Sequence, residues 1–206
     1  MKVILVNGSP HKHGATDTAL QEVATTLREC GIEAEIFWLG NDPIAGCIGC
    51  MACAKSGHCF RDDVVNRFID SYANADGFIF GSAVHFAACS GALSSFMDRL
   101  FYGRTHLFRL KPAAAVVSCR RGGATAAFDE INKYFTISQM LTVGSQYWNQ
   151  IHGNNAEEAR QDLEGMQTMR TLGRNMAYLL NCLEAGRQAG VALPETEEKQ
   201  KTNFIR

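Results

Sequence analysis

The sequence shows no surplus of either charge, no long apolar stretch and no low-complexity tract, and each absence excludes a class of protein. Its 206 residues carry 20 Lys and Arg against 21 Asp and Glu, a formal net charge of −1. Nucleic-acid-binding proteins usually carry a basic surplus, so we expect no nucleic-acid partner. The apolar stretches are too short to span a bilayer, so we expect no membrane association either.

The N-terminus also lacks the pattern of a signal peptide. After Met1 and Lys2, only residues 3–6 are apolar before Asn7 and Gly8 interrupt the run. We therefore expect a cytoplasmic protein, in which cysteines normally stay reduced. A group of cysteines in such a protein is interpreted first as metal-binding or redox-active, rather than as a disulfide framework.

Hydrophobic residues make up 46% of the chain and fall into runs that alternate between strand and helix patterns. Short apolar runs indicate strands buried on both faces, and apolar residues three or four positions apart indicate amphipathic helices. The predicted strands are residues 3–6, 33–39, 77–82, 113–118 and 141–146, and the predicted helices are residues 15–30, 62–75, 91–102, 124–138 and 155–186. This alternation predicts an α/β fold with an open parallel sheet and helices on both faces. No repeat or linker is visible, so residues 1–193 are interpreted as one domain and residues 194–206 as a C-terminal tail.

The loop after the first predicted strand has the composition of an anion site, at the edge of the sheet where such folds bind ligands. It reads NGSPHKHGAT, residues 7–16, and leads directly into a helix. Backbone N–H groups at a helix N-terminus attract anions, while Ser9 and Thr16 add hydroxyl donors and Lys12 a positive charge. The loop has neither a Walker pattern nor G-x-G-x-x-G, and ordinary helix capping is an alternative interpretation.

The loops after three later strands are also unusual. Residues 81–102 read GSAVHFAACSGALSSFMDRLFY and contain a histidine directly after the strand. Residues 118–125 read SCRRGGAT, in which two glycines allow the backbone to approach a flat ring closely. Residues 146–153 read QYWNQIHG and bring Tyr147 and Trp148 to the same edge of the predicted sheet.

Three of these loops together resemble the flavodoxin-like NADPH-dependent FMN reductase family. NGSP…GAT is similar to the FMN-phosphate loop of that family, commonly Gly-Ser-Pro-Arg…Gly-Asn-Thr, with His11 in place of Arg and Ala15 in place of Asn. After the third strand the family typically shows Gly-Ser-Pro-Val-Tyr, and this chain has Ala83 and His85 in place of Pro and Tyr. The positions that match are Gly81, Ser82, Val84, Gly91, Leu93, Phe96, Asp98 and Arg99. The resemblance implies a five-stranded flavodoxin-like sheet of order 2-1-3-4-5 that binds FMN.

The resemblance also implies which residues hold FMN. The implied set is Ser9, His11, Lys12, Gly14, Ala15 and Thr16 at the phosphate, Ser82, Ala83, Val84, His85 and Phe86 beside the ring, and Ser118, Arg120, Gly122 and Gly123 at its pyrimidine edge. Backbone N–H groups and Arg120 would there stabilise negative charge on the reduced ring. Asp98 and Arg99 are interpreted as an ion pair at a helix end rather than as catalytic residues.

Four cysteines follow the second predicted strand in the pattern C-x2-C-x2-C-x5-C. They are Cys47, Cys50, Cys53 and Cys59. Four thiolates are the ligand count of a [4Fe-4S] cluster and of a tetrahedral zinc site. The spacing resembles the compact motif of archaeal-type iron–sulfur flavoproteins, a branch of the same superfamily, which implies a cluster near FMN. Free thiols and zinc are the alternatives.

The resemblance implies an FMN-dependent oxidoreductase. Such an enzyme would pass electrons from NAD(P)H or a reduced carrier to a quinone, flavin, nitro compound or protein acceptor. We name no catalytic side chain, because the redox chemistry belongs to the flavin. The alternative is a non-enzymatic iron–sulfur flavoprotein that serves as an electron carrier or redox sensor. A hydrolase or nucleotide binder is disfavoured, because no nucleophile and base are recognisable.

The expected partners are a small-molecule or protein redox partner and further copies of the same chain. Flavins in this family often lie at a dimer interface, so the resemblance implies a homodimer or homotetramer. Tyr147 or Trp148 of a neighbouring subunit would then cover the flavin ring.

Overall fold

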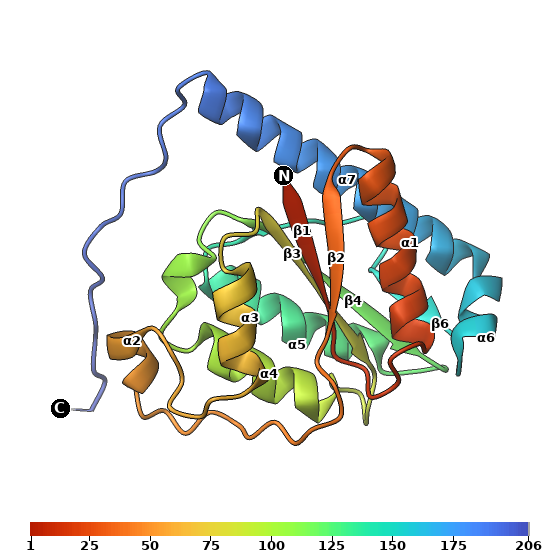
Figure 1. Ribbon diagram of the computed structural model, residues 1–206, viewed down its shortest axis with the longest axis horizontal. Helices are drawn as coiled ribbons and strands as arrows, with labels where there is room; N and C mark the ends of the chain where they lie inside the picture. Colours follow the sequence, from red (N-terminus) through yellow and green to blue (C-terminus); the bar gives the residue numbers. More distant parts are fainter. Residues whose placement is uncertain (206) are drawn as a thin grey trace.

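A parallel sheet forms the centre of the protein in the computed structural model, which describes residues 1–205 (Figure 1). Its strands are β1 (Lys2–Asn7), β2 (Glu33–Trp38), β3 (Gly77–Ala83), β4 (Pro112–Cys119), β5 (Leu141–Thr142) and β6 (Gln150–His152). The strand order is β2-β1-β3-β4-β5, with β6 also paired to β4, and every pairing is parallel. The predicted flavodoxin-like order is therefore confirmed.

Helices cover both faces of the sheet (Figure 1). One face packs against α1 (Ala15–Glu29), α6 (Ala156–Gln161) and α7 (Leu163–Gln188), and the other against α3 (Val64–Tyr72), α4 (Gly91–Phe101) and α5 (Ala124–Ile137). Strand β1 shows why, because Val3 and Leu5 belong to the first core while Ile4 and Val6 belong to the second. Successive side chains of a strand point to opposite faces, so a wholly apolar strand needs cover on both sides.

The fifth position of the sheet differs from the prediction. Residues 141–146 were expected to form one strand, but β5 has only two residues and β6 continues the edge further along β4. Asn149 explains the second strand. Its side-chain Nδ2 donates to the backbone carbonyl of Ala115 at 3.0 Å, and its backbone carbonyl accepts from Val117 N at 3.0 Å. The chain thus returns to β4 through a buried polar side chain, which an apolar pattern does not reveal.

The helix predicted over residues 155–186 is also divided. Asp162 interrupts it with φ −76° and ψ 83°, ending α6 and preceding α7. Its carboxylate accepts from Gly165 N at 2.9 Å and from His152 N at 2.7 Å, which caps α7 and ties it to β6.

Two short helices complete the described chain, α2 (Ala52–Ser56) and the 3₁₀ helix η1 (Thr105–Leu107). Residues 191–205, beyond α7, form no helix or strand. None of the helices within residues 1–205 has the length and apolarity needed to cross a membrane.

Candidate functional site

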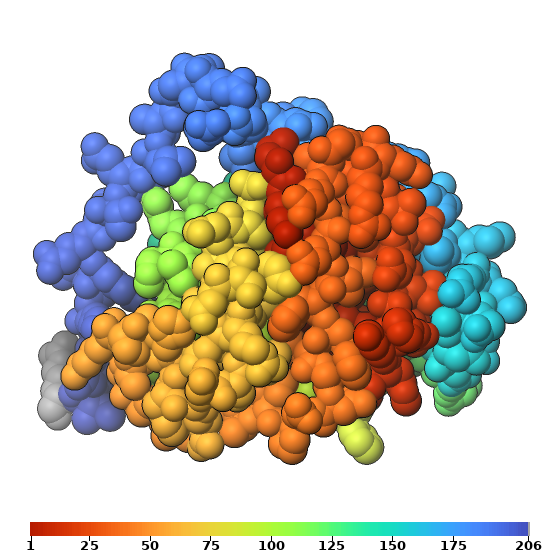
Figure 2. All heavy atoms as spheres, in the orientation of Figure 1, coloured from red at the N-terminus to blue at the C-terminus, as the bar shows by residue number. Residues whose placement is uncertain are grey.

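An open cleft of about 720 Å³ lies at the carboxyl ends of the central strands. The loop after β1 forms one wall, the ends of β3 and β4 form the floor, and residues before and within α6 close the far side. In Figure 2 the red loop after β1 lies beside the orange segment after β2. Trp38 at the end of β2 joins the two, because its Nε1 donates to Ser9 O at 2.9 Å.

Most of the residues predicted to hold FMN line this one cleft. They are Ser9, His11, Lys12, Gly14, Ala15, Thr16, Ala83, Val84, His85, Ser118 and Arg120. Parallel pairing explains this convergence, because it places the carboxyl ends of all the strands at the same edge of the sheet.

The N-terminus of α1 provides unpaired donors at one end of the cleft. Within the described chain, the N–H groups of Ala15, Thr16 and Asp17 donate to no backbone or side-chain acceptor, and Gly14 offers no side-chain cap. The hydroxyls of Thr16 and Ser118 lie 2.7 Å apart beside them. Unpaired N–H groups at a helix N-terminus favour an anion, so this end fits a phosphate group.

Four predicted residues do not line the cleft. Ser82 is fully buried below it, where its hydroxyl accepts from Ser90 N at 2.8 Å. Phe86 is fully exposed and has a φ of 50°, while a Cβ at Gly122 would meet no atom within 4 Å. Gly123 has φ 92°, and a Cβ there would lie 2.8 Å from the Cα of Ala87, so this glycine lets the loops after β3 and β4 pack together.

Sequence reasoning missed two parts of the cleft wall. Trp38 and Asn41 follow β2, and Lys12 Nζ lies 5.6 Å from the centre of the Trp38 ring, within cation–π range. Residues 153–157, which run from the end of β6 into the first turn of α6, form the opposite wall. Trp38 ends a predicted strand at the same edge of the sheet, which was a usable signal. The 153–157 wall depended on β6, which was not predicted.

The four cysteines surround a second, small cavity of about 20 Å³. Its wall consists of Gly46, Cys47, Ile48, Cys50, Met51, Cys53, Cys59, Phe60, Arg61, Arg99 and Tyr102, with no carboxylate among them. Cys47 and Cys50 are exposed, whereas Cys53 and Cys59 are half-buried. Among residues 1–205, no three His, Cys, Asp or Glu side chains are grouped as one metal ion would require.

The cysteine cavity is formed by a different set of residues from the cleft, and the expected cluster near FMN stays a prediction. The loop leaves β2 near the cleft but gathers its cysteines at the C-terminal end of α4. Cys53 Sγ donates there to the carbonyl of Tyr102 at 2.9 Å. The small cavity shares no wall residue with the cleft.

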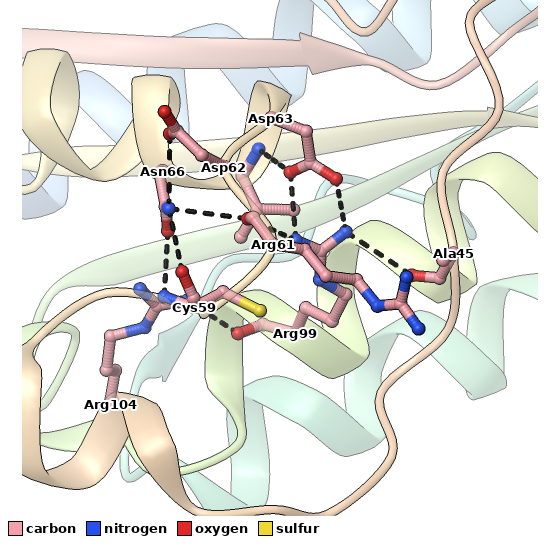
Figure 3. Close-up of polar contacts among 9 residues, drawn as sticks. Ala45, Cys59, Arg61, Asp62, Asp63, Asn66, Arg99 and Arg104 are labelled. Carbon is pink, nitrogen blue, oxygen red and sulfur yellow. Dashed lines mark hydrogen bonds and ion pairs between the residues drawn. The ribbon is translucent and has the colours of Figure 1, made fainter.

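Arg99 of α4 holds both ends of the cysteine loop (Figure 3). Its side chain is 1% exposed, and its guanidinium donates to Ala45 O at 3.3 Å before the cysteines and to Arg61 O at 3.0 Å after them. It pairs with both carboxylate oxygens of Asp63, at 2.5 and 2.9 Å. The expected pair with Asp98 is not formed, because Asp98 accepts instead from the hydroxyl of Tyr134 at 2.6 Å.

Asn66 fixes the last cysteine of the loop (Figure 3). Its Oδ1 accepts from Cys59 N at 2.8 Å, and its Nδ2 donates to Cys59 O at 2.9 Å. The amide thus replaces a strand neighbour and satisfies both backbone groups of Cys59 in the buried region at the start of α3.

Charge balance at this loop favours the ionised form of Asp63. Burial raises the pKa of the Asp63 carboxyl, but the hydrogen bonds from Arg99 and from Val65 N outweigh burial and lower the pKa below its usual range.

Two other cysteines lie near the cleft, and both are buried. Burial and a hydrogen bond to Glu130 raise the pKa of Cys89 to about 12. Burial also raises the pKa of Cys119, whose Sγ lies 3.5 Å from His152 Nδ1. Because the thiolate is the reactive form, neither site favours an activated thiol.

Comparisons with known proteins agree with this arrangement. The family model described as NADPH-dependent FMN reductase matches residues 1–155. An iron–sulfur flavoprotein of Methanocaldococcus jannaschii is 32% identical over 192 residues, covering 89% of this chain and 100% of the relative. An iron–sulfur flavoprotein of Methanosarcina thermophila is 27% identical over 192 residues, covering 91% and 99%. Among solved structures, a flavodoxin from the domain Archaea has a TM-score of 0.60 at 15% identity, covering 88% and 99%, which supports the fold alone.

Replacing Asp63 with Asn should destabilise the protein by about 3 kcal/mol, because it leaves the Arg99 charge buried without its partner. Since the folded-state pKa of Asp63 is lowered, its contribution is present above the ordinary carboxyl pKa and disappears as pH falls through the folded-state value. Urea unfolding should therefore show a large difference between wild type and Asp63→Asn at about pH 7 and a smaller one at about pH 3.

The matched control is Asp62→Asn, since Asp62 is exposed and accepts only a 3.4 Å contact from Asn66. It should change the unfolding free energy by less than about 0.5 kcal/mol. Equal effects of the two substitutions would contradict the role assigned to the Arg99–Asp63 pair.

Proposed function

This chain belongs to the NADPH-dependent FMN reductase family, and from that premise we propose that it is an FMN-dependent oxidoreductase that also carries an iron–sulfur cluster. The observation that carries the proposal is the cleft itself, which combines unpaired N–H groups at the N-terminus of α1 with an open volume of about 720 Å³. When bound, FMN would supply the hydride and electron chemistry, which no side chain of the cleft provides.

The residues of the cleft would hold FMN by its two ends. The N–H groups of α1, with the hydroxyls of Thr16 and Ser118, would bind the phosphate, and Lys12 would add positive charge. His85 follows the end of β3, at the position where the family resemblance implies tyrosine, and Arg120 follows β4. These two side chains would orient the ring and favour negative charge on it.

The four cysteines would hold a [4Fe-4S] cluster. Two observations support this proposal. The relatives that match nearly the whole chain are named iron–sulfur flavoproteins. The four thiols line one cavity without a carboxylate, which supplies the four-thiolate ligand set that a cluster requires.

The enzyme would accept electrons from NAD(P)H or a reduced carrier and deliver them to a quinone, flavin, nitro compound or protein. We also propose a homodimer or homotetramer. Tyr147 and Trp148 support it, because these two aromatic side chains, in edge-to-face contact with ring centroids 4.7 Å apart, remain about half exposed, at 51% and 49%. Exposed aromatic pairs of this kind are enriched at protein interfaces.

The phosphate assignment predicts that Thr16→Val weakens FMN binding about tenfold, the effect of losing one hydrogen bond to a charged group. Titration of the apoprotein, followed by quenching of flavin fluorescence, measures this affinity. Riboflavin lacks the phosphate, so its affinity should not change. Thr25→Val, an exposed threonine further along α1, is the matched control. A protein that binds no FMN, or a Thr16→Val variant that weakens riboflavin equally, would refute the assignment.

The cluster assignment predicts that anaerobically reconstituted wild type contains about four iron atoms and four acid-labile sulfides per chain. Cys59→Ser should lose most of this iron and the broad visible absorbance that accompanies it. Cys182→Ser removes an exposed cysteine outside the loop and should retain both. Iron-free wild type, or equal iron in both variants, would leave the thiols without a cluster.

The enzymatic assignment predicts that NADPH or NADH bleaches the flavin absorbance under anaerobic conditions, with saturation in stopped-flow traces. If only a reduced ferredoxin-type protein bleaches it, the chain is an electron carrier or redox sensor instead. Both results presuppose bound FMN, so they separate the two functions without testing the cofactor again.

A further inference from the structure

Arg104 is a buried cation that lacks an anionic partner. The whole residue is 1% exposed, and it is among the largest fully buried side chains of the protein. Within residues 1–205 no carboxylate lies within ion-pair distance of it, and its Nε is buried without a hydrogen-bond partner. An uncompensated buried charge is costly, so the site calls for negative charge that the carboxylates of the described chain do not provide.

The position of Arg104 identifies where that negative charge belongs. Its Nη1 donates to the carbonyl of Gly57 at 3.1 Å, and Gly57 lies between Cys53 and Cys59 in the loop. Residue Gly103, directly before it, is so close to the loop that a Cβ there would lie 3.0 Å from Cys53 Sγ. Burial lowers the pKa of Arg104, and the negative charges of Cys53, Cys59 and Asp70 oppose that effect only in part.

A comparison with the neighbouring Arg99 shows that the unpaired charge of Arg104 is unusual. Both guanidinium groups are buried beside the cysteine loop, but the charge of Arg99 is cancelled by Asp63. The charge of Arg104 is not, so Arg104 is a buried cation that remains available to offset an additional anion at the loop.

A purely structural role does not account for the charge. Arg104 Nη2 donates at 2.6 Å to the carbonyl of Arg99, in the last turn of α4, and thereby satisfies one helix-end carbonyl (Figure 3). A neutral amide could donate the same bond without burying a full charge.

We propose that Arg104 is a positioning residue that supplies the countercharge of the four-thiolate centre and stabilises its more negative, reduced state. This inference rests on the proposed cluster. Net charge and hydrogen bonding near the sulfurs set the reduction potential of iron–sulfur centres, so a fixed buried cation raises that potential.

The test compares three variants of the full chain after anaerobic reconstitution. Arg104→Gln keeps a donor and removes the charge, and Arg104→Lys keeps the charge. Lys111→Gln is the matched control, because Lys111 is a half-buried cation that donates to Ala73 O at 2.6 Å, away from the cysteines. Reduction potentials come from redox titration monitored by electron paramagnetic resonance, with iron counted per chain.

Arg104→Gln should shift the one-electron equilibrium about tenfold toward the oxidised state, a potential lower by about 59 mV. Arg104→Lys should restore most of the shift, and Lys111→Gln should leave the potential unchanged. The iron-free proteins provide a second measurement, because losing an unpaired buried charge should leave apo Arg104→Gln at least as stable as the wild-type apoprotein.

An unchanged potential in iron-loaded Arg104→Gln would overturn the inference while leaving the cluster established. An apo Arg104→Gln that unfolds more readily than wild type would also overturn it, since Arg104 would then be only a structural donor. A wild type that takes up no iron would remove the cluster itself, and the wild-type iron count alone identifies that outcome.

Discussion

Parallel pairing of strands whose two faces are both buried is the constraint on which the rest of the structure depends. All eight residues of β4 are buried, so its side chains are committed to the two cores. Polar chemistry is then confined to the ends of the strands, and parallel pairing collects the carboxyl ends at one edge. Thr16 and Ser118 meet there although they lie 102 positions apart in the sequence.

The cysteine loop depends on the sheet only indirectly, through helix α4. Within the loop only the five residues of α2 are helical, and Gly49, Met51 and Gly57 all adopt positive φ values. Its conformation is imposed from α4, whose buried Arg99 ties both ends of the loop. Helix α4 is in turn fixed by the core on the second face of the sheet. The thiols are therefore placed by tertiary contacts rather than by the local sequence around them.

These dependences explain what could be predicted from the sequence. The central strands were predictable because runs such as residues 3–6 are wholly apolar and end at glycine or polar residues. The strand at residues 141–146 was predicted wrongly, because the edge is continued by β6 through the buried amide of Asn149. The spacing of the cysteines indicated one shared centre, but not its location, which is set by a contact between Arg99 and Asp63, 36 positions apart.

The protein presents positive charge at two sites, the cleft and the cysteine loop, and it does so by different means. At the cleft, N–H groups and the side chain of Lys12 face an open volume, which suits a phosphate that enters from solvent. At the cysteine loop, the cation is a fixed guanidinium on the inner side, near Cys53 and Cys59, while Cys47 and Cys50 are exposed. A charge that cannot move or exchange with solvent would act on the reduction potential of a cluster bound there. The exposed thiols would leave the outer side for electron exchange, so potential and access would be controlled by opposite sides of one loop.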